Sequence, residues 1–180
     1  KYSTWGGKSA MSKVLIVVDM QNDFVTGSLG SKEAREIVPN VKNKIKQYAD
    51  RGDRIIFTRD THGENYLDTP EGKKLPVKHC LQGTEGWQIV PGLETEHCEY
   101  VDKPTFGWMH WDDFGTQDEI ELIGVCTDIC VVSNALILKA KYPEAVISVD
   151  ASCCAGVTPE KHKAALETMR SCQIDVNGED

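Results

Sequence analysis

The sequence has no excess of positive charge, no long apolar run and no Cys-x-x-Cys pair, and each absence excludes a class of protein. With 28 acidic and 20 basic residues, its formal net charge is −8, which disfavours binding to nucleic acids or acidic membranes. No stretch approaches the ~20 consecutive apolar residues of a membrane-spanning helix. The seven cysteines therefore indicate neither a structural zinc knuckle nor a thioredoxin-like site.

The remaining composition is typical of one globular domain. Its 180 residues are 40% hydrophobic and 27% charged, which is enough for one sizeable core. The odd number of cysteines, several beside apolar runs, predicts free thiols and a reducing, cytoplasmic location. Residues 1–10 are polar and lack the apolar core of a signal peptide, so we expect a tail or an artificial extension, followed by a folded domain over 11–180.

Strand and helix patterns alternate along the chain. Strands are predicted at 13–19, 54–58, 99–102, 122–125 and 145–149, with a possible edge strand at 173–176, and the apolar runs at 13–19 and 122–125 are typical of buried strands. Helical spacing predicts amphipathic helices over 32–51, 128–141 and 159–171. Pro39 suggests that the first of these helices begins near it, and His162 is expected on a solvent-facing side. The alternation predicts a three-layer α/β/α domain with a mostly parallel, doubly wound, Rossmann-like sheet of five to six strands.

Chemically complementary side chains follow four of these strands. Asp19, Asp60, Lys103 and Cys130 each stand at or just past a predicted strand end. Parallel strands joined by right-handed crossovers place their carboxyl ends at one edge of the sheet, where ligands of open α/β sheets bind. One such residue is weak support for a site, but a carboxylate, an ammonium group and a thiol together predict a catalytic one.

Cys130 lies in a strand–turn–helix stretch. Thr127 and Asp128 offer side-chain oxygens that could cap the helix predicted to follow. Cys130 would then occupy the first helical turn, where free backbone N–H groups and the helix dipole lower a thiol pKa and favour a nucleophile. The alternative at this point is a small buried apolar residue, which is the usual role of a lone cysteine.

A long irregular segment, 63–87, follows the second strand, and such segments are often functional. Asp60, His62 and His79 form an Asp-x-His…His set that suits zinc, iron or manganese. Three unrelated polar loop residues are the alternative. Carboxylates of the same segment that could complete the set are Glu64, Asp68 and Glu71.

Five motifs together carry a family resemblance. They are Asp19-Met-Gln-Asn-Asp-Phe24, Asp60-Thr-His62, Lys78-His79-Cys80, Asp102-Lys103 and Gly124-Val-Cys-Thr-Asp-Ile-Cys130. With them the chain resembles the isochorismatase-like cysteine hydrolases, and within them the nicotinamidases, over about residues 13–174. The resemblance implies a catalytic triad of Asp19, Lys103 and Cys130. It also implies a cis peptide before Cys126, with the backbone N–H groups of Cys126 and Cys130 forming an oxyanion hole.

The same resemblance implies a metal ion and an aromatic substrate pocket. Asp60, His62 and His79 match the family's ligands, and Glu71 after Pro70 is the candidate for a fourth. The implied substrate contacts are Phe24 and Phe106, with Trp108 as a further aromatic candidate. Leu75 stands near a position where the family often has tryptophan.

Resemblance to the nicotinamidases implies hydrolysis of nicotinamide to nicotinate and ammonia through a cysteine thioester. It also implies a small carboxamide as the binding partner. We further expect a homo-oligomer. Another amidase, a carbamoyl-amide hydrolase or an isochorismatase of the same family is the alternative activity. A non-catalytic metal- or ligand-binding protein and a thiol redox protein are alternatives from other classes.

Overall fold

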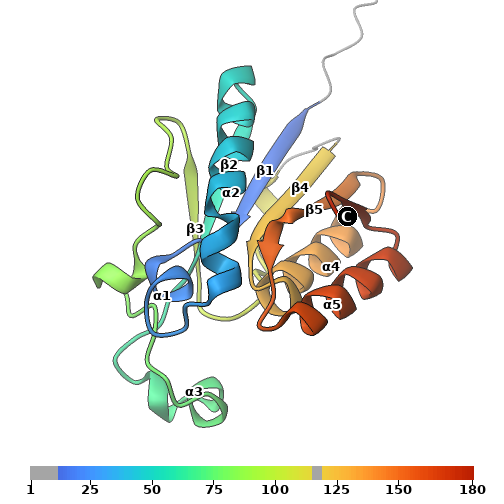
Figure 1. Cartoon of the computed structure of the whole chain (residues 1–180). Coiled ribbons are helices and arrows are strands. Elements are labelled where there is room, and N and C mark those ends of the chain that lie inside the picture. The colour runs from blue at the N-terminus through green and yellow to red at the C-terminus, as the bar shows by residue number, and fades with distance from the viewer. Residues whose placement is uncertain (1–11, 115–118) are drawn as a thin grey trace, which may run out of the picture.

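The computed structural model describes residues 12–114 and 119–180, so the predicted tail at 1–10 lies outside the described residues. A six-stranded sheet runs through it in the order β3-β2-β1-β4-β5-β6, and every neighbouring pair is parallel (Figure 1). The predicted three-layer, doubly wound architecture is confirmed. The strands are β1 Lys13–Val18, β2 Arg54–Asp60, β3 Glu99–Lys103, β4 Glu119–Val125, β5 Val146–Ala155 and β6 Asp175–Asn177.

β5 extends beyond its predicted end at 149. The register against β4 shifts between Leu122 and Gly124, and pairing resumes at Gly124 with Cys154. This irregularity lets β5 continue along its neighbour to Ala155. Asp150 therefore lies within the strand, where its carboxylate pairs with Lys44 at 2.8 Å, rather than at the strand end.

The helices are α1 Asn22–Val25, α2 Lys32–Arg51, α3 Pro70–Lys74, α4 Val132–Lys141 and α5 Pro159–Ser171. The three predicted helices are present as α2, α4 and α5, although α4 begins at Val132 and not at 128, and the short helices α1 and α3 were not predicted. Short 3₁₀ segments occur at Tyr66–Asp68, Glu85–Trp87 and Trp111–Phe114, so the segment predicted to be irregular contains α3 and two of these turns. Within the described residues, no helix combines the length and apolar character needed to cross a bilayer.

α2 passes through Pro39 without a break, contrary to the prediction that it begins there. Pro39 is exposed, so water can satisfy the carbonyl that its missing N–H leaves free. The buried face formed by Ile37, Val41 and Ile45 anchors the helix on both sides of the proline. Ser31 caps the start by accepting a hydrogen bond from the Ala34 amide, and Gly52 ends the helix at φ 73°.

The apolar side chains of β1 alternate between two cores, one on each face of the sheet. Val14, Ile16 and Val18 pack with α4 and α5, whereas Leu15 and Val17 pack with α2. Burial on both faces explains the continuous apolar run in the sequence. The sheet thus forms the central layer, with α2 packed on one face and α4 and α5 on the other (Figure 1).

Candidate active site

A fully buried ion pair joins the ends of β1 and β3. Lys103 Nζ lies 2.8 Å from Asp19 Oδ2, and neither residue has any exposed surface. The second carboxylate oxygen of Asp19 accepts a 2.7 Å hydrogen bond from the Thr58 hydroxyl. Asp19 has φ 50°, a left-handed conformation uncommon for a residue other than glycine. The chain turns sharply at this residue, and both oxygens of its side chain are held.

Cys130 lies in a π-helical turn, Thr127–Val131, that precedes α4. The predicted capping oxygens serve other contacts, because Asp128 Oδ1 accepts from the Val157 amide at 3.0 Å and Thr127 Oγ1 contacts His162 Nδ1 at 2.7 Å. His162 is accordingly half-buried rather than solvated. These contacts tie the turn that carries the thiol to the segment after β5 and to α5.

The thiol of Cys130 meets the buried ion pair. Its sulfur interacts with the Asp19 carboxylate, and Cys130 is only 6% exposed. Burial raises the pKa of the Cys130 thiol well above its ordinary value, and the Asp19 charge raises it further, while the Lys103 ammonium only partly opposes them. The sequence-based prediction of a lowered thiol pKa is therefore wrong for this arrangement. The desolvation of a buried sulfur exceeds the effect of its position near a helix start.

Burial and neighbouring charges set the protonation states of Asp19 and Lys103, the two residues beside the thiol. Burial raises the pKa of the Asp19 carboxyl, although the Lys103 ammonium opposes the shift. Burial alone would lower the pKa of Lys103, but the charges of Asp19 and Asp60 outweigh it and raise that pKa above its ordinary value. The lysine therefore remains an ammonium group, and the carboxylate has an increased affinity for a proton.

The peptide bond between Val125 and Cys126 is cis, as the resemblance implied. It follows Gly124, which has φ 117° and whose position leaves no room for a side chain, because a Cβ there would lie 2.1 Å from the Val18 carbonyl oxygen. This close approach of β4 to β1 brings the Cys130 turn beside the residue that follows Val18, which is Asp19. The role of the Cys126 and Cys130 amides as an oxyanion hole stays a prediction.

A cavity of about 350 Å³ opens at this edge of the sheet. The predicted contacts Phe24 and Phe106 line it together with Cys126, Cys130 and Leu75. Trp108, the third predicted contact, does not line the cavity. Its backbone amide donates to Asn134 Oδ1 at 2.8 Å, and its ring packs against the core on the α4 and α5 side of the sheet.

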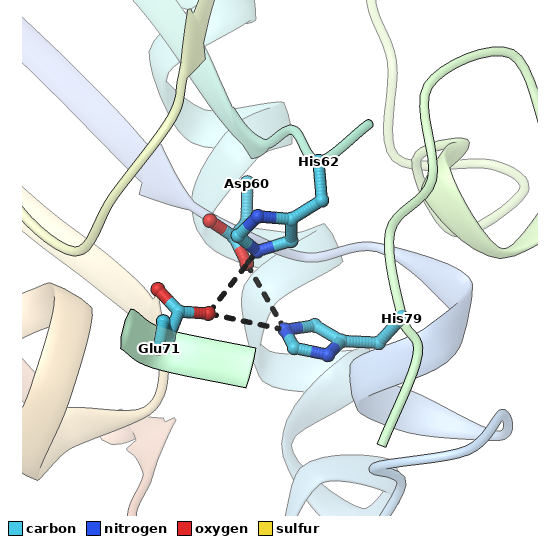
Figure 2. A group of neighbouring side chains, drawn as sticks. All are labelled: Asp60, His62, Glu71 and His79. Atoms are coloured by element: carbon cyan, nitrogen blue, oxygen red, sulfur yellow. Dashed lines mark hydrogen bonds and ion pairs between the residues drawn. The ribbon is translucent and has the colours of Figure 1, made fainter. Parts of the chain in front are cut away.

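Asp60, His62, Glu71 and His79 converge, as Figure 2 shows, with one donor atom from each residue within 4.8 Å of every other, and Asp60, Glu71 and His79 also line the cavity. Asp60 Oδ2 lies 2.8 Å from His62 Nε2 and 3.3 Å from His79 Nε2. Glu71 Oε2 lies 3.3 Å from His62 Nε2 and 3.9 Å from His79 Nε2. Of the spare carboxylates, Glu71 joins the group, whereas Glu64 and Asp68 do not.

The protonation of this group suits a divalent cation. His79 Nδ1 contacts the Val77 carbonyl oxygen at 2.7 Å, which assigns a proton to Nδ1 and directs Nε2 toward the carboxylates, where it donates to Asp60 or binds a metal ion. Burial alone would raise the pKa of Asp60, but hydrogen bonds from His62 and His79 lower it to about 2. Among the described residues, Asp60 Oδ1 is a buried oxygen without a hydrogen-bond partner, and it lies 3.9 Å from the Lys103 ammonium. The other oxygen, Oδ2, faces both imidazoles. Two imidazoles and two carboxylates fit a transition metal ion.

Two residues that sequence reasoning missed hold these groups in place. Tyr66 is fully buried, and its ring centroid lies 4.7 Å from that of His62 and 4.9 Å from that of His79. Asn134 is also fully buried and donates to the Cys130 carbonyl at 2.9 Å. An asparagine on the apolar face of a helix was a detectable signal, whereas nothing in the sequence distinguished the tyrosine.

Comparison with known proteins agrees with this geometry. The family model described as the isochorismatase domain matches residues 13–178. The chain is 29% identical to the nicotinamidase/pyrazinamidase of Mycobacterium tuberculosis, over 91% of this chain and 97% of that protein.

Two solved structures extend the comparison from sequence to fold. The nicotinamidase of Bacillus subtilis superposes with a TM-score of 0.81 at 26% identity, covering 93% of this chain and 99% of that one. The pyrazinamidase of Pyrococcus horikoshii in complex with zinc superposes with a TM-score of 0.80 at 27% identity, covering 92% and 98%. The family model matches almost the whole length of this chain, and the similar proteins are hydrolases. This chain therefore belongs to the isochorismatase domain family.

Proposed function

We propose that this protein hydrolyses nicotinamide to nicotinate and ammonia through a thioester on Cys130. The observation that carries the proposal is that the Cys130 thiol lies close enough to Asp19 and Lys103 for both charges to shift its pKa, while Asp19 and Lys103 are themselves paired at 2.8 Å. The thiol lines a cavity that the four metal-ligand candidates also border through Asp60, Glu71 and His79. A nucleophile and a group for holding a heteroaromatic ring thus face one small space, with the proton acceptor buried beside the nucleophile.

The first half-reaction begins with proton transfer from Cys130 to Asp19. The raised pKa of the thiol means that the resting enzyme keeps it protonated, and the raised pKa of Asp19 makes that carboxylate a better proton acceptor. The sulfur attacks the carboxamide carbon as its proton moves to Asp19. The Lys103 ammonium offsets the negative charge that this transfer leaves on the sulfur. The C–N bond then breaks, and Asp19 returns the proton to the departing ammonia.

The second half-reaction restores the thiol. Asp19, again a carboxylate, accepts a proton from a water molecule that attacks the thioester carbon. The C–S bond breaks, the carboxylic acid leaves, and the proton held by Asp19 returns to the Cys130 sulfur. In both halves the amides of Cys126 and Cys130 are proposed to stabilise the oxyanion, an effect of roughly 3–4 kcal/mol per donor in comparable sites.

Asp60, His62, Glu71 and His79 would hold a divalent zinc, iron or manganese ion. When bound, such an ion supplies an electron-pair acceptor for the ring nitrogen of the substrate and so acts mainly as a template. Phe24, whose ring centroid lies 5.5 Å from that of His79, and Phe106 are placed to contact the ring faces. The zinc complex of the Pyrococcus horikoshii relative supports a metal of this class.

Ammonia release tests the proposal. Nicotinamide is compared with benzamide, which has the same carboxamide but no ring nitrogen, each with and without a chelator. We expect nicotinamide to be hydrolysed, chelation to slow that reaction, and benzamide to be a poor substrate in both conditions. Absence of ammonia from nicotinamide, with release from an N-carbamoyl amide instead, would favour the related carbamoyl-amide hydrolase activity.

A further inference from the structure

The side-chain amide of Gln21 makes two hydrogen bonds to the backbone of Asp60, one as acceptor and one as donor, as the backbone of an adjacent strand would. Gln21 Oε1 accepts from the Asp60 amide at 2.8 Å, and Gln21 Nε2 donates to the Asp60 carbonyl oxygen at 2.9 Å. The same Nε2 donates to the Trp87 carbonyl oxygen at 2.9 Å. Gln21 is completely buried, so its amide group has no solvent to exchange partners with. These bonds fix both backbone polar groups of one metal-ligand candidate.

Asp23, two residues further on, holds the segment that carries the two imidazoles. Its Oδ2 accepts from the Cys80 amide at 2.8 Å, next to His79. Cys80 has φ 48°, and its carbonyl oxygen accepts from the His62 amide at 2.9 Å. One carboxylate therefore fixes the residue that adjoins His79 and bonds to His62.

The surroundings of Asp23 leave its carboxylate little freedom. A Cβ at Gly86 would lie 2.2 Å from Asp23 Oδ2, and a Cβ at Gly27 would lie 2.4 Å from Asp23 Oδ1. The backbone of this loop is also paired with the segment after the 3₁₀ turn Glu85–Trp87, since the Asn22 amide donates to the Gln88 carbonyl and the Val90 amide donates to the Met20 carbonyl, both at 2.9 Å. The loop that begins with Asp19 is therefore joined to the metal-ligand segment by both side chains and backbone.

Glu71 is held differently. It lies in α3, whose start is capped by Thr69 Oγ1 accepting from the Gly72 amide at 3.0 Å. Its side chain keeps 18% of its surface exposed, against 3–7% for the other three members of the group. The first three ligand candidates thus depend on the loop after β1, and the fourth does not share these contacts.

We propose that Gln21 and Asp23 are positioning residues for the metal site, with Gln21 aligning Asp60 and Asp23 aligning His62 and His79. The inference rests on the metal site of the proposed function, but not on the substrate. It assigns to the loop that carries the catalytic Asp19 a second task, namely to hold three metal ligands at fixed distances. Partners that orient metal ligands typically contribute 10- to 100-fold to metal affinity.

The test measures binding of Zn²⁺ by competition with a chromophoric chelator, and the absorption spectrum of the Co²⁺-loaded protein. Gln21→Met and Asp23→Ala are each expected to weaken Zn²⁺ binding by about 10- to 100-fold and to alter the Co²⁺ spectrum. Asp23→Asn keeps an oxygen that accepts from the Cys80 amide, so it should restore most of the affinity. Asn22→Ala is the matched control, because the side chain of Asn22 donates through Nδ2 to the Glu85 carbonyl at 2.9 Å, and Glu85 is not part of the metal-ligand group.

The outcomes separate this inference from the proposed activity. Zn²⁺ affinity and Co²⁺ spectra that are unchanged in both Gln21→Met and Asp23→Ala would overturn it, as would an Asn22→Ala variant with an equal loss. If Gln21→Met does not fold, the Asp23→Ala and Asp23→Asn pair decides, because Asp23 is only partly buried. If the wild-type protein binds Zn²⁺ but leaves nicotinamide intact, only the proposed nicotinamide hydrolysis is contradicted. If the wild-type protein binds no metal, both that activity and the positioning role of Gln21 and Asp23 are contradicted.

Discussion

The proposed catalytic triad and the metal-ligand group lie side by side but are built in different ways. Lys103 ends β3, Asp19 directly follows β1, and Cys130 lies in the turn after β4; all three are no more than 6% exposed. In the other group only Asp60 belongs to a strand, while His62, Glu71 and His79 come from the segment between β2 and β3. Strand register therefore places the first group, whereas hydrogen bonds from a neighbouring loop place most of the second.

This difference predicts which substitutions stop the chemistry and which change only substrate or metal binding. The largest effect is expected for Cys130→Ala, because no other group can form the thioester. Ammonia release from nicotinamide should fall at least about 10⁴-fold, as when other covalent nucleophiles are removed. The circular dichroism spectrum and melting temperature should stay close to wild type, and retained activity would show that the nucleophile is misassigned.

Lys103→Met tests the energetic side of the triad. It leaves the Asp19 carboxylate buried without its counter-ion, and such a change typically costs about 3–5 kcal/mol. Urea denaturation should show this loss of unfolding free energy together with loss of ammonia release. The control is Lys46→Met, which removes the exposed partner of Asp50 and should change stability by less than about 1 kcal/mol. Equal stability losses in the two variants would argue against the buried pair.

Within the metal-ligand group, the four residues should not contribute equally. His79→Ala removes a buried ligand and should weaken Zn²⁺ binding by more than about 100-fold, beyond the usual effect of an orienting partner. Glu71→Gln alters the most exposed member of the group and should cost no more than about 10-fold. Competition with a chelator measures both constants. A larger loss for Glu71→Gln would reverse the order that the structure predicts.

The smallest effect concerns pH. Burial lowers the pKa of His162 below its ordinary value of 6.5. Between the two values the unfolded chain holds more protons, so the free energy of unfolding falls as the pH falls through this window and is fully retained above 6.5. His162→Gln should flatten that part of the stability curve, measured by urea denaturation at a series of pH values. Identical pH dependence in the two proteins would contradict the assignment.

The sequence indicated where Asp19, Lys103 and Cys130 lie because strand ends are visible in it. The strand patterns located β1 to β4 closely enough to predict that these residues share one edge of the sheet, and in the structure Lys103 pairs with Asp19 at 2.8 Å beside the Cys130 turn, while their catalytic roles stay a prediction. The metal ligands were predicted only from a short pattern and a resemblance, because no local rule shows that the chain after His62 folds back to bring His79 beside it. The contacts of Gln21 and Tyr66 also depend on the path of this segment, and no periodic pattern in the sequence indicates them.

Two errors have the same physical origin. The pKa of Cys130 and the surroundings of His162 were inferred from local position, but burial by distant segments controls both. Trp108 likewise packs away from the cavity because Asn134, 26 residues further along the chain, holds its amide. Predictions about the metal's identity, a homo-oligomer and a cytoplasmic location concern properties beyond the fold of one chain, and they stay predictions.

The most direct test of the central claim is mass spectrometry of acid-quenched protein during turnover of nicotinamide. A pyridine-acyl adduct on the peptide that contains Cys130, absent from Cys130→Ala and lost as nicotinate accumulates, is the predicted result. Steady release of ammonia while the Cys130 peptide stays unmodified at every quench time, with equal release by Cys130→Ala, would contradict the account.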